Sequence, residues 1–169
     1  MIRAGALTPR GIDWAVTGAV AANSYRDETR TTSDIDVLMT LAGTPMTDIE
    51  SSLHELGWTT TAALPEGWLL RLAHHRRGRI DMVATLTDYE VGALARAHRV
   101  EVNGLPVKVM AVEDVIILKL VANRYRDIAD IESILAAKPA LDRAYLAHWF
   151  ETFDLAHRFQ RIESATGQS

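Results

Sequence analysis

The sequence predicts an α+β fold with a mixed β-sheet, flanking helices and an α-helical C-terminal part. Short apolar runs rich in strand-forming residues, bounded by turn residues, fill much of the first two thirds. An Asn-Gly pair between two such runs indicates a β-hairpin. From residue 112 onward, apolar residues recur at helical spacing. We therefore expect a core over residues 1–111 and a helical part over 112–169, which together form one compact unit of ordinary domain size.

The first part is expected to alternate between strands, helices and turns. In chain order we expect a strand over 12–17, one or two helical turns over 19–26, a buried strand over 34–41, a helix over 46–56, strands over 68–73 and 79–86, and a helix over 89–98. Gly57 would end the first long helix, and Thr87–Asp88 would cap the next. Asn103–Gly104 fits a type I′ hairpin turn, and Pro106 places that hairpin at a sheet edge.

The second part carries two apolar helical faces, and further helices are expected over 141–151 and 154–163. The faces are formed by Val115, Ile116 and Leu120, and by Ile128, Ile131 and Leu135. Lys119 interrupts the first apolar run. If the helix is unbroken, Lys119, Asn123, Arg126 and Asp130 form one polar stripe. Alternatively, Asp127 caps a new helix, and the stripe is then broken.

Composition excludes several classes of site. The chain has no cysteine, so it has no disulfide, thiolate zinc site or cysteine nucleophile, which fits a reducing cytoplasm. No apolar run approaches the ~20 residues of a membrane helix, and the N-terminus lacks the apolar segment of a secretory signal. We therefore expect a cytoplasmic protein without a membrane partner. The net charge of −4 gives no general affinity for nucleic acids, which would require a local basic patch.

Two aspartates at the start of the expected strand over 34–41 suggest a metal site. Asp34 and Asp36 are two residues apart, so in a strand both side chains lie on one face. Two carboxylates this close repel each other and raise each other's pKa unless a cation lies between them. Oxygen ligands suit Mg²⁺, which also accepts substrate phosphates as ligands. The alternative is a solvated strand start, which short acidic motifs match by chance.

Other residues favour the metal site. Gly18 follows a strand, where glycine lets backbone amides approach a phosphate closely. Asp81 is another acid inside an apolar strand, and three carboxylates at one sheet edge would suit a two-metal phosphoryl-transfer site. Lys119 could meet phosphate charge as a point cation.

In this combination the chain resembles the nucleotidyltransferase superfamily related to DNA polymerase β. The resemblance rests on the strand before Gly18, the stretch RTTSDIDVL and the isolated strand acid Asp81. The later stretch EDVIILKLVANRYRDIADIESIL is similar to the AbiEii/MenT-like branch, which combines Arg-x-Thr-x-Asp-Ile-Asp with a lysine-bearing helix and a following Arg-Asp-x-x-Asp. The resemblance spans about residues 12–137.

The resemblance implies a role for each of these positions. Asp34, Asp36 and Asp81 would be metal ligands for Mg²⁺ or Mn²⁺, and the catalytic set would be Asp34, Asp36, Asp81, Lys119 and one of Asp127 and Asp130. Asp81 would activate the attacking hydroxyl, and Lys119 would bind phosphate. The nucleoside triphosphate would contact Thr17, Gly18, Ala19, Arg30, Thr32 and Lys119. Ala19 departs from the family pattern, which has Ser or Gly there.

The same resemblance implies transfer of a nucleoside monophosphate to a hydroxyl, with RNA, at the 3′ end of transfer RNA, as the acceptor. Members of that branch are often toxins with a cognate antitoxin protein, or parts of phage defence. The candidate RNA-binding residues are Arg71, Arg76, Arg77 and Arg79, beside a turn rich in basic residues. Two alternatives remain: a small-molecule nucleotidyltransferase of the aminoglycoside-modifying kind, and a non-enzymatic nucleotide-binding relative.

Overall fold

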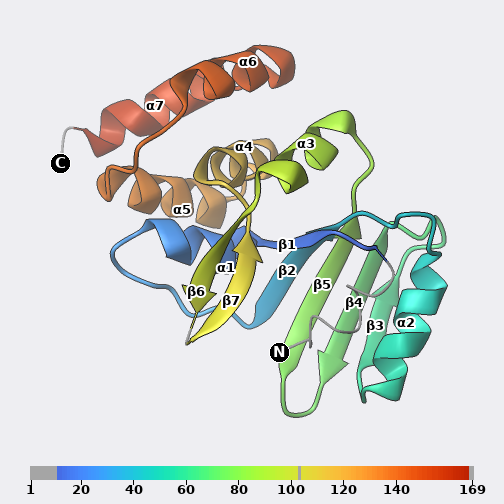
Figure 1. Ribbon diagram of the computed structural model, residues 1–169. Helices are drawn as coiled ribbons and strands as arrows, with labels where there is room; N and C mark the ends of the chain where they lie inside the picture. Colours follow the sequence, from blue (N-terminus) through green and yellow to red (C-terminus); the bar gives the residue numbers. More distant parts are fainter. Residues whose placement is uncertain (1–10, 103, 168–169) are drawn as a thin grey trace.

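A seven-stranded mixed sheet forms the centre of the computed structural model, which describes residues 11–102 and 104–167 (Figure 1). The strands are β1 (Trp14–Thr17), β2 (Asp34–Met39), β3 (Thr59–Ala63), β4 (Leu69–His74), β5 (Gly78–Ala84), β6 (His98–Val102) and β7 (Leu105–Val109). Their order is β3-β4-β5-β2-β1-β7-β6. The β2–β5 and β1–β7 pairs are parallel, and the other neighbours are antiparallel. The predicted α+β class is thus confirmed.

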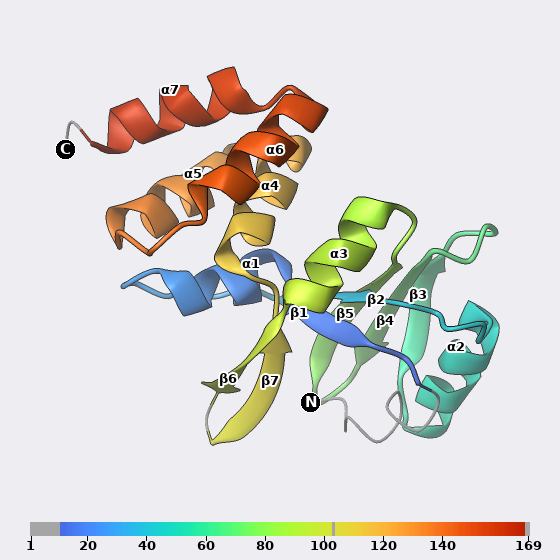
Figure 2. The ribbon, with the colours of Figure 1, turned by 45° about the horizontal axis from the view of Figure 1, so that its top comes forward.

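Helices cover the two faces of this sheet unequally. They are α1 (Gly18–Ala22), the short 3₁₀ helix η3 (Asn23–Tyr25), α2 (Met46–Glu55), α3 (Asp88–Arg96), α4 (Val112–Ala122), α5 (Tyr125–Ala136), α6 (Arg143–Phe153) and α7 (Ala156–Thr166). Helix α2 packs on one face, beside β3 and β4, whereas α3 to α7 gather on the opposite face (Figures 1 and 2). None of the helices in the described ranges has the length and apolar character required to cross a bilayer.

Alternation along β2 divides the core into two clusters. Val37 and Met39 pack with Ile49 and Leu53 of α2 on one face of the sheet. Leu38 packs on the opposite face, in the larger cluster formed with α3 to α7. Successive strand residues point to opposite faces, so the side chains of Asp34 and Asp36 lie on the same face as Leu38. The side chains of Asp34 and Asp36 therefore lie on the face that α3 to α7 cover.

Most of the expected elements are confirmed, with shifted ends. A capping box starts α3, in which the Thr87 hydroxyl accepts from the Glu90 backbone N–H at 3.2 Å, as expected for this helix start. The chain leaves α2 through Gly57 at φ +85°. The β6–β7 hairpin lies at the sheet edge, as Pro106 predicted, although Asn103 of its turn lies outside the described residues. Strand β3 was not predicted.

Of the two alternatives for the chain after residue 112, the unbroken helix is wrong. Helix α4 ends at Ala122, and Asn123 takes a left-handed conformation at φ 50° and ψ 32°. Helix α5 then starts at Tyr125 with Arg124 as its N-cap residue. The second helix is thus confirmed, although Asp127 lies in its first turn and is not the N-cap residue that the alternative expected. Asparagine tolerates this conformation better than most residues, which explains the break at this position.

A buried polar cluster ties α3, α4 and α6 together. Asp114 has no exposed surface, and its carboxylate accepts from the Tyr145 hydroxyl at 2.6 Å and from Arg96 Nε at 3.1 Å. Arg96 also donates to Glu113 at 2.9 Å, and its guanidinium lies 3.7 Å from the centre of the Tyr145 ring. Because buried charges are tolerated only when paired, this cluster fixes the position of α4 between its neighbours.

Replacing Asp114 should therefore cost far more stability than replacing an exposed acid. We expect Asp114→Ala to lower the free energy of unfolding by about 1–3 kcal/mol, because the Tyr145 hydroxyl loses its acceptor and Arg96 keeps only Glu113 as a partner. Glu163→Ala, which breaks the exposed pair with Arg143, should cost less than about 1 kcal/mol. Urea unfolding at neutral pH compares the two variants. Equal losses would show that the cluster is not a buried anchor.

Candidate active site

Asp34 and Asp36 lie at the start of β2, on the face of the sheet that α3 to α7 cover. The Thr32 hydroxyl donates to Asp34 Oδ1 at 2.9 Å, which orients that carboxylate. Asp36 pairs in register with Thr17 on β1 and with Asp81 on β5. The central position of β2 therefore places the Asp36 carboxylate between residues of two neighbouring strands.

Gly18 is pressed against this carboxylate. It has a φ of +64°, which favours glycine, and a Cβ placed on it would overlap Asp36 Oδ2 and Cγ. Two separate constraints therefore favour glycine at this position: the backbone conformation and the close contact with Asp36. Thr17 and Ala19 flank this glycine in the turn from β1 into α1. Ala19 supplies no hydroxyl, so any phosphate here would meet backbone groups and the Thr17 side chain.

Asp81 lies next to Asp36 across the β2–β5 pair, as its predicted place on a neighbouring strand required. Its carboxylate is engaged by a cation, since Arg71 Nε donates to Asp81 Oδ2 at 2.8 Å from β4. Arg71 was predicted as an RNA contact, and the structure brings it to the third acid. The Arg71 side chain is 52% exposed, so this pair lies at the open side of the site.

The helices bring cations to the same place. Lys119 is 6% exposed, and its Nζ donates to Asp130 at 2.6 Å and to Asp127 at 3.4 Å. Both acids that the sequence left open thus contact the lysine, and Asp130 lies closer. The break between α4 and α5 makes this possible, because it folds Asp127 back toward the last turn of α4.

Asp130 also holds two arginines from the segment before β2. Arg26 Nη1 donates to Asp130 Oδ1 at 2.8 Å, and Arg30 Nη2 donates to Oδ2 at 3.1 Å. Arg26 is held further by the Asn23 side chain. The sequence analysis missed Arg26, and its chain separation of 104 residues from Asp130 explains why no local pattern could have found it.

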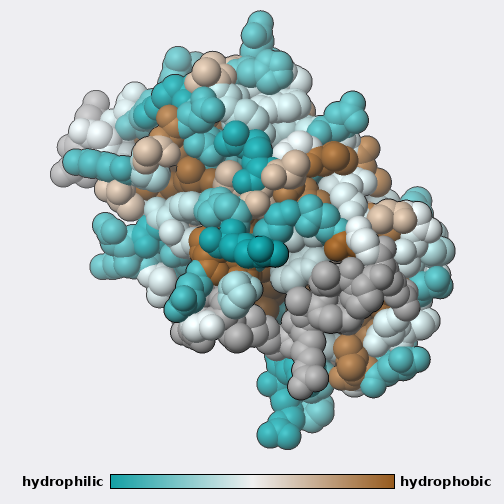
Figure 3. Space-filling model, in the orientation of Figure 1, coloured by the Kyte–Doolittle hydropathy of each residue, from teal (hydrophilic) through white to brown (hydrophobic). Residues whose placement is uncertain are grey.

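One cavity of about 560 Å³ joins these groups. The predicted residues that line it are Thr17, Gly18, Ala19, Arg30, Thr32, Asp34, Asp36, Arg71, Arg79, Asp81, Lys119, Asp127 and Asp130. Arg76 and Arg77 do not line it. They lie on the exposed β4–β5 turn, which projects with hydrophilic side chains at the bottom of the view in Figure 3. The sheet supplies Asp34, Asp36 and Asp81 to this cavity, and α5 supplies Asp127 and Asp130. The helices and the segment before β2 supply most of its cations.

The pKa shifts follow this division of charge. Burial, then the charges of Asp34 and Asp81, raise the pKa of Asp36 above its usual range. Burial would also raise the pKa of Asp130, but hydrogen bonds from Lys119, Arg30 and Arg26 outweigh it and lower the pKa. The pKa of Asp127 is lowered despite its burial, chiefly by hydrogen bonds from Arg124 and the charge of Lys119. The sheet acids thus repel one another, whereas the helix acids are neutralised.

The sheet acids fit a hard divalent cation. Asp34 and Asp36 offer only oxygen ligands and share one face of β2. Because the pKa of Asp36 is raised by burial and by neighbouring acids, a bound cation would stabilise its ionised form. Across the described ranges, no three His, Cys, Asp or Glu side chains are grouped as a complete ligand set. Asp81 faces Arg71 instead. The arrangement therefore suits Mg²⁺, which takes one or two carboxylates and fills its remaining positions with water and phosphate oxygens.

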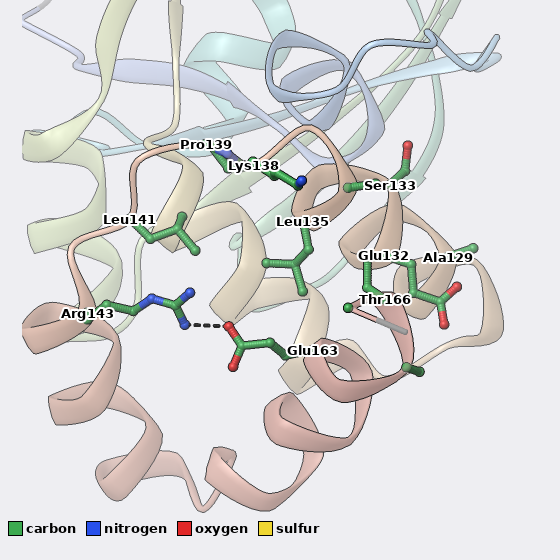
Figure 4. A pocket seen from close by; sticks show the side chains of 13 residues that line it. Ala129, Glu132, Ser133, Leu135, Lys138, Pro139, Leu141, Arg143, Glu163 and Thr166 are labelled. Carbon is green, nitrogen blue, oxygen red and sulfur yellow. Dashed lines mark hydrogen bonds and ion pairs between the residues drawn. The ribbon is translucent and has the colours of Figure 1, made fainter. Parts of the chain in front are cut away.

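A second cavity, of about 890 Å³, lies on the other side of α5 (Figure 4). Ala129 and Ser133 of α5 line it, and the Arg143–Glu163 ion pair crosses it from α6 to α7. Its charged side chains, Glu132, Lys138, Arg143 and Glu163, are of mixed sign. It lacks the opposed groups of acids and cations that distinguish the first cavity, so we assign no chemistry to it.

Residues 2–154 match a protein family described as a nucleotidyl transferase of unknown function (DUF2204). The chain belongs to this family. The nucleotidyltransferase expected from the sequence is thereby confirmed, and the protein is an enzyme of that kind. The narrower resemblance to the AbiEii/MenT-like branch stays a prediction. No curated protein matches the sequence.

Solved structures of other proteins share the fold. The lincomycin-bound lincosamide antibiotic adenylyltransferase LnuA aligns with a TM-score of 0.59 and 13% identity over 78% of this chain and 91% of its own. The antibiotic-resistance factor ANT(2'')-Ia aligns with a TM-score of 0.56 and 18% identity over 98% and 93%. An antigenic nucleotidyltransferase-like protein from Paracoccidioides brasiliensis gives 0.53 and 16% over 94% and 87%. At these identities the likeness concerns the fold alone.

The contact between Gly18 and Asp36 makes the nucleotidyltransferase sensitive to one methyl group. Gly18→Ala and the control Gly43→Ala, at φ +80° with no atom close to its Cβ position, both impose about 1–2 kcal/mol of left-handed strain. Only Gly18→Ala must also displace Asp36, which should lower nucleotidyl transfer about 100-fold. Urea unfolding and a transfer assay measure both effects. Equal activity in the two variants would contradict the assignment of Gly18 to the site.

Asp36 should destabilise the metal-free enzyme at neutral pH. A pKa raised by folding means that the folded state binds the proton more tightly than the unfolded state. The stability contribution of Asp36 is therefore greatest below its unfolded pKa of about 3.9 and is lost as the pH rises through the folded pKa. We expect Asp36→Asn to raise the free energy of unfolding at about pH 7 more than at about pH 4. Urea unfolding in a chelator tests this, with exposed Asp48→Asn as control. An equal change at both pH values would contradict the pKa argument.

Proposed function

We propose that this nucleotidyltransferase moves a nucleoside monophosphate from a nucleoside triphosphate to a hydroxyl acceptor, with Mg²⁺ held by Asp34 and Asp36. The observation that carries the proposal is the opposition of charge across one cavity, with acids on β2 and β5 and cations around Asp130. A triphosphate with its metal ion has the matching pattern, because the cation needs carboxylates and the phosphates need basic groups. Mn²⁺ would serve the same oxygen ligands.

Each side chain has a proposed part in this reaction. Bound Mg²⁺ supplies neutralisation of charge on the phosphate oxygens. Lys119 and Arg30 hold the phosphate chain, and Thr17, Gly18, Ala19 and Thr32 border it. The acceptor oxygen attacks the α-phosphorus, the bond to the bridging oxygen breaks, and pyrophosphate leaves with that oxygen. Asp81 takes the proton of the acceptor hydroxyl, and Arg71 positions its carboxylate at 2.8 Å.

The helical part over 112–169 is proposed to complete the site of the core over 1–111. Lys119, Asp127 and Asp130 all come from it, and without them the acids of the sheet would face no cation from the helices. Asp127 and Asp130 are proposed as positioning residues, because each holds Lys119 through a buried ion pair. The division into these two parts otherwise stays a prediction.

RNA is the proposed acceptor, in keeping with the resemblance to the toxin branch that acts on the 3′ end of transfer RNA. Arg71 and Arg79 line the cavity, and exposed Arg76 and Arg77 continue the positive charge outward along the β4–β5 turn. A row of arginines leading out of the cavity suits a phosphate backbone. A role as a toxin neutralised by a cognate antitoxin rests on the same resemblance.

A small-molecule acceptor is the second candidate. The likeness to LnuA and ANT(2'')-Ia favours it, since both are named for antibiotics and align over nine tenths or more of their own chains. A small acceptor would need only the cavity itself, with Asp81 and Arg71 at its open side.

One assay tests the proposed reaction and separates the acceptors. The protein, Mg²⁺ and each labelled triphosphate are incubated with total RNA or with lincosamide and aminoglycoside antibiotics. We expect label in transfer RNA, whereas label in a drug would favour the second candidate. Asp34→Ala should lower transfer about 1,000-fold, because it removes several kcal/mol of metal-dependent charge stabilisation. Asp48→Ala, an exposed acid of α2, is the control. A folded Asp34→Ala variant with full activity would overturn the metal assignment, and no label with any acceptor would favour the non-enzymatic relative.

A further inference from the structure

Arg124 occupies the break between α4 and α5 and was not among the predicted site residues. The left-handed Asn123 turns the chain so that Arg124 precedes the first turn of α5. Its Nε donates to Asp127 Oδ2 at 2.6 Å and its Nη2 to Oδ1 at 3.2 Å, a two-point contact between guanidinium and carboxylate. Arg124 also lines the cavity that holds Asp34 and Asp36.

The two partners of this ion pair differ sharply in exposure. The Arg124 side chain is 72% exposed, whereas that of Asp127 is 3% exposed. The arginine therefore approaches a buried acid from the open cavity, and most of its surface faces solvent. Because water already reaches most of the Arg124 side chain, the guanidinium can leave the carboxylate without crossing a packed interior.

Asp127 would keep partners if the Arg124 guanidinium left it. Lys119 Nζ lies 3.4 Å from its Oδ1, and the backbone N–H of Arg124 donates to its Oδ2 at 3.2 Å. Departure of the guanidinium would thus leave no buried carboxylate unpaired, which is the condition that makes breaking most buried pairs costly.

The other cations that contact the buried acids of α5 are not placed to move in this way. Lys119 is buried between two carboxylates, and Arg26 is 3% exposed and held by both Asp130 and Asn23. Arg30 is 39% exposed but reaches Asp130 through both Nε and Nη2. Among these four cations, Arg124 is the most exposed, and its partner Asp127 keeps other hydrogen-bond donors if the guanidinium leaves.

We propose that Arg124 is a phosphate-binding residue that exchanges its carboxylate for substrate: its guanidinium leaves Asp127 when a nucleoside triphosphate enters and donates to a phosphate oxygen. This inference rests on the proposed function and adds a substrate contact to it. Arginine suits the exchange, because the same planar fork that binds a carboxylate matches two oxygens of a phosphate. Arg124 lines the same cavity as the proposed metal ligands Asp34 and Asp36.

Inorganic tripolyphosphate with Mg²⁺ is the direct probe, because it carries the phosphates without a base or an acceptor. We expect Arg124→Gln to weaken its binding about tenfold or more in calorimetry. The affinity of Arg124→Lys for tripolyphosphate should lie between those of the wild type and Arg124→Gln, because lysine keeps the charge but lacks the planar guanidinium. The matched control is Arg126→Gln, which removes an equal charge from the same cavity and from a side chain that forms no ion pair with a described residue. Equal weakening by the two glutamine variants would overturn the proposal.

A double-mutant cycle tests the exchange itself. Asp127→Asn should tighten tripolyphosphate binding by a larger factor when Arg124 is present than in the Arg124→Gln background, because only then does Asp127 compete with the phosphate. An equal factor in both backgrounds would show that Arg124 serves only to cap α5. Urea unfolding of every variant confirms that the folded protein is compared.

The outcomes also separate this inference from the proposed function. Wild-type protein that binds tripolyphosphate through Arg124 but transfers no nucleotide would overturn the proposed function alone. Transfer activity with unchanged tripolyphosphate binding in Arg124→Gln would overturn the exchange alone. Wild-type protein that binds neither tripolyphosphate nor a nucleoside triphosphate would overturn both.

Discussion

The buried carboxylate of Asp130 is the constraint on which the site depends. It accepts from Lys119 at 2.6 Å, from Arg26 at 2.8 Å and from Arg30 at 3.1 Å, and these residues come from α4 and from the segment before β2. Without it, three cations would crowd one wall of the cavity and repel one another. One acid on α5 thereby joins two separate stretches of chain and keeps their positive charge beside the sheet.

The two walls of the cavity obtain their charge by different physical means. On the sheet, pairing register brings Asp36 beside Asp81, and the period of two puts Asp34 on the same face, so these acids are held together although they repel. On the helical side, the acids lie buried among cations that neutralise them. Within the described ranges, Asp34 and Asp36 thus form no ion pair, whereas Asp81 pairs with Arg71. The helical wall carries more positive charge than its acids balance. Both imbalances would be relieved by a metal ion and a phosphate chain bound between the walls.

Features with a local cause were predictable from the sequence. The common face of Asp34 and Asp36 follows from strand geometry alone, and the start of α3 follows from Thr87. Features that depend on packing were not. Strand β3 reads TTTAA and is largely exposed, so it carries no apolar alternation, and it exists because β4 pairs with it. Arg26 lies 104 residues from Asp130, and no spacing rule joins positions so far apart.

The departure at Ala19 gains a physical explanation from this arrangement. A serine there would offer one hydroxyl to a phosphate, whereas this chain places Lys119, Arg30 and Arg124 around the same cavity. Hydrogen bonds from charged donors to phosphate are about twice as strong as neutral ones, so cations can replace a missing hydroxyl. Gly18 still brings the backbone close to Asp36, because that approach depends on the absence of a side chain and not on the next residue. The turn at Gly18 thus keeps its close contact with Asp36. In the proposed function, phosphate would be bound chiefly by the cations near the break between α4 and α5 and less by the turn.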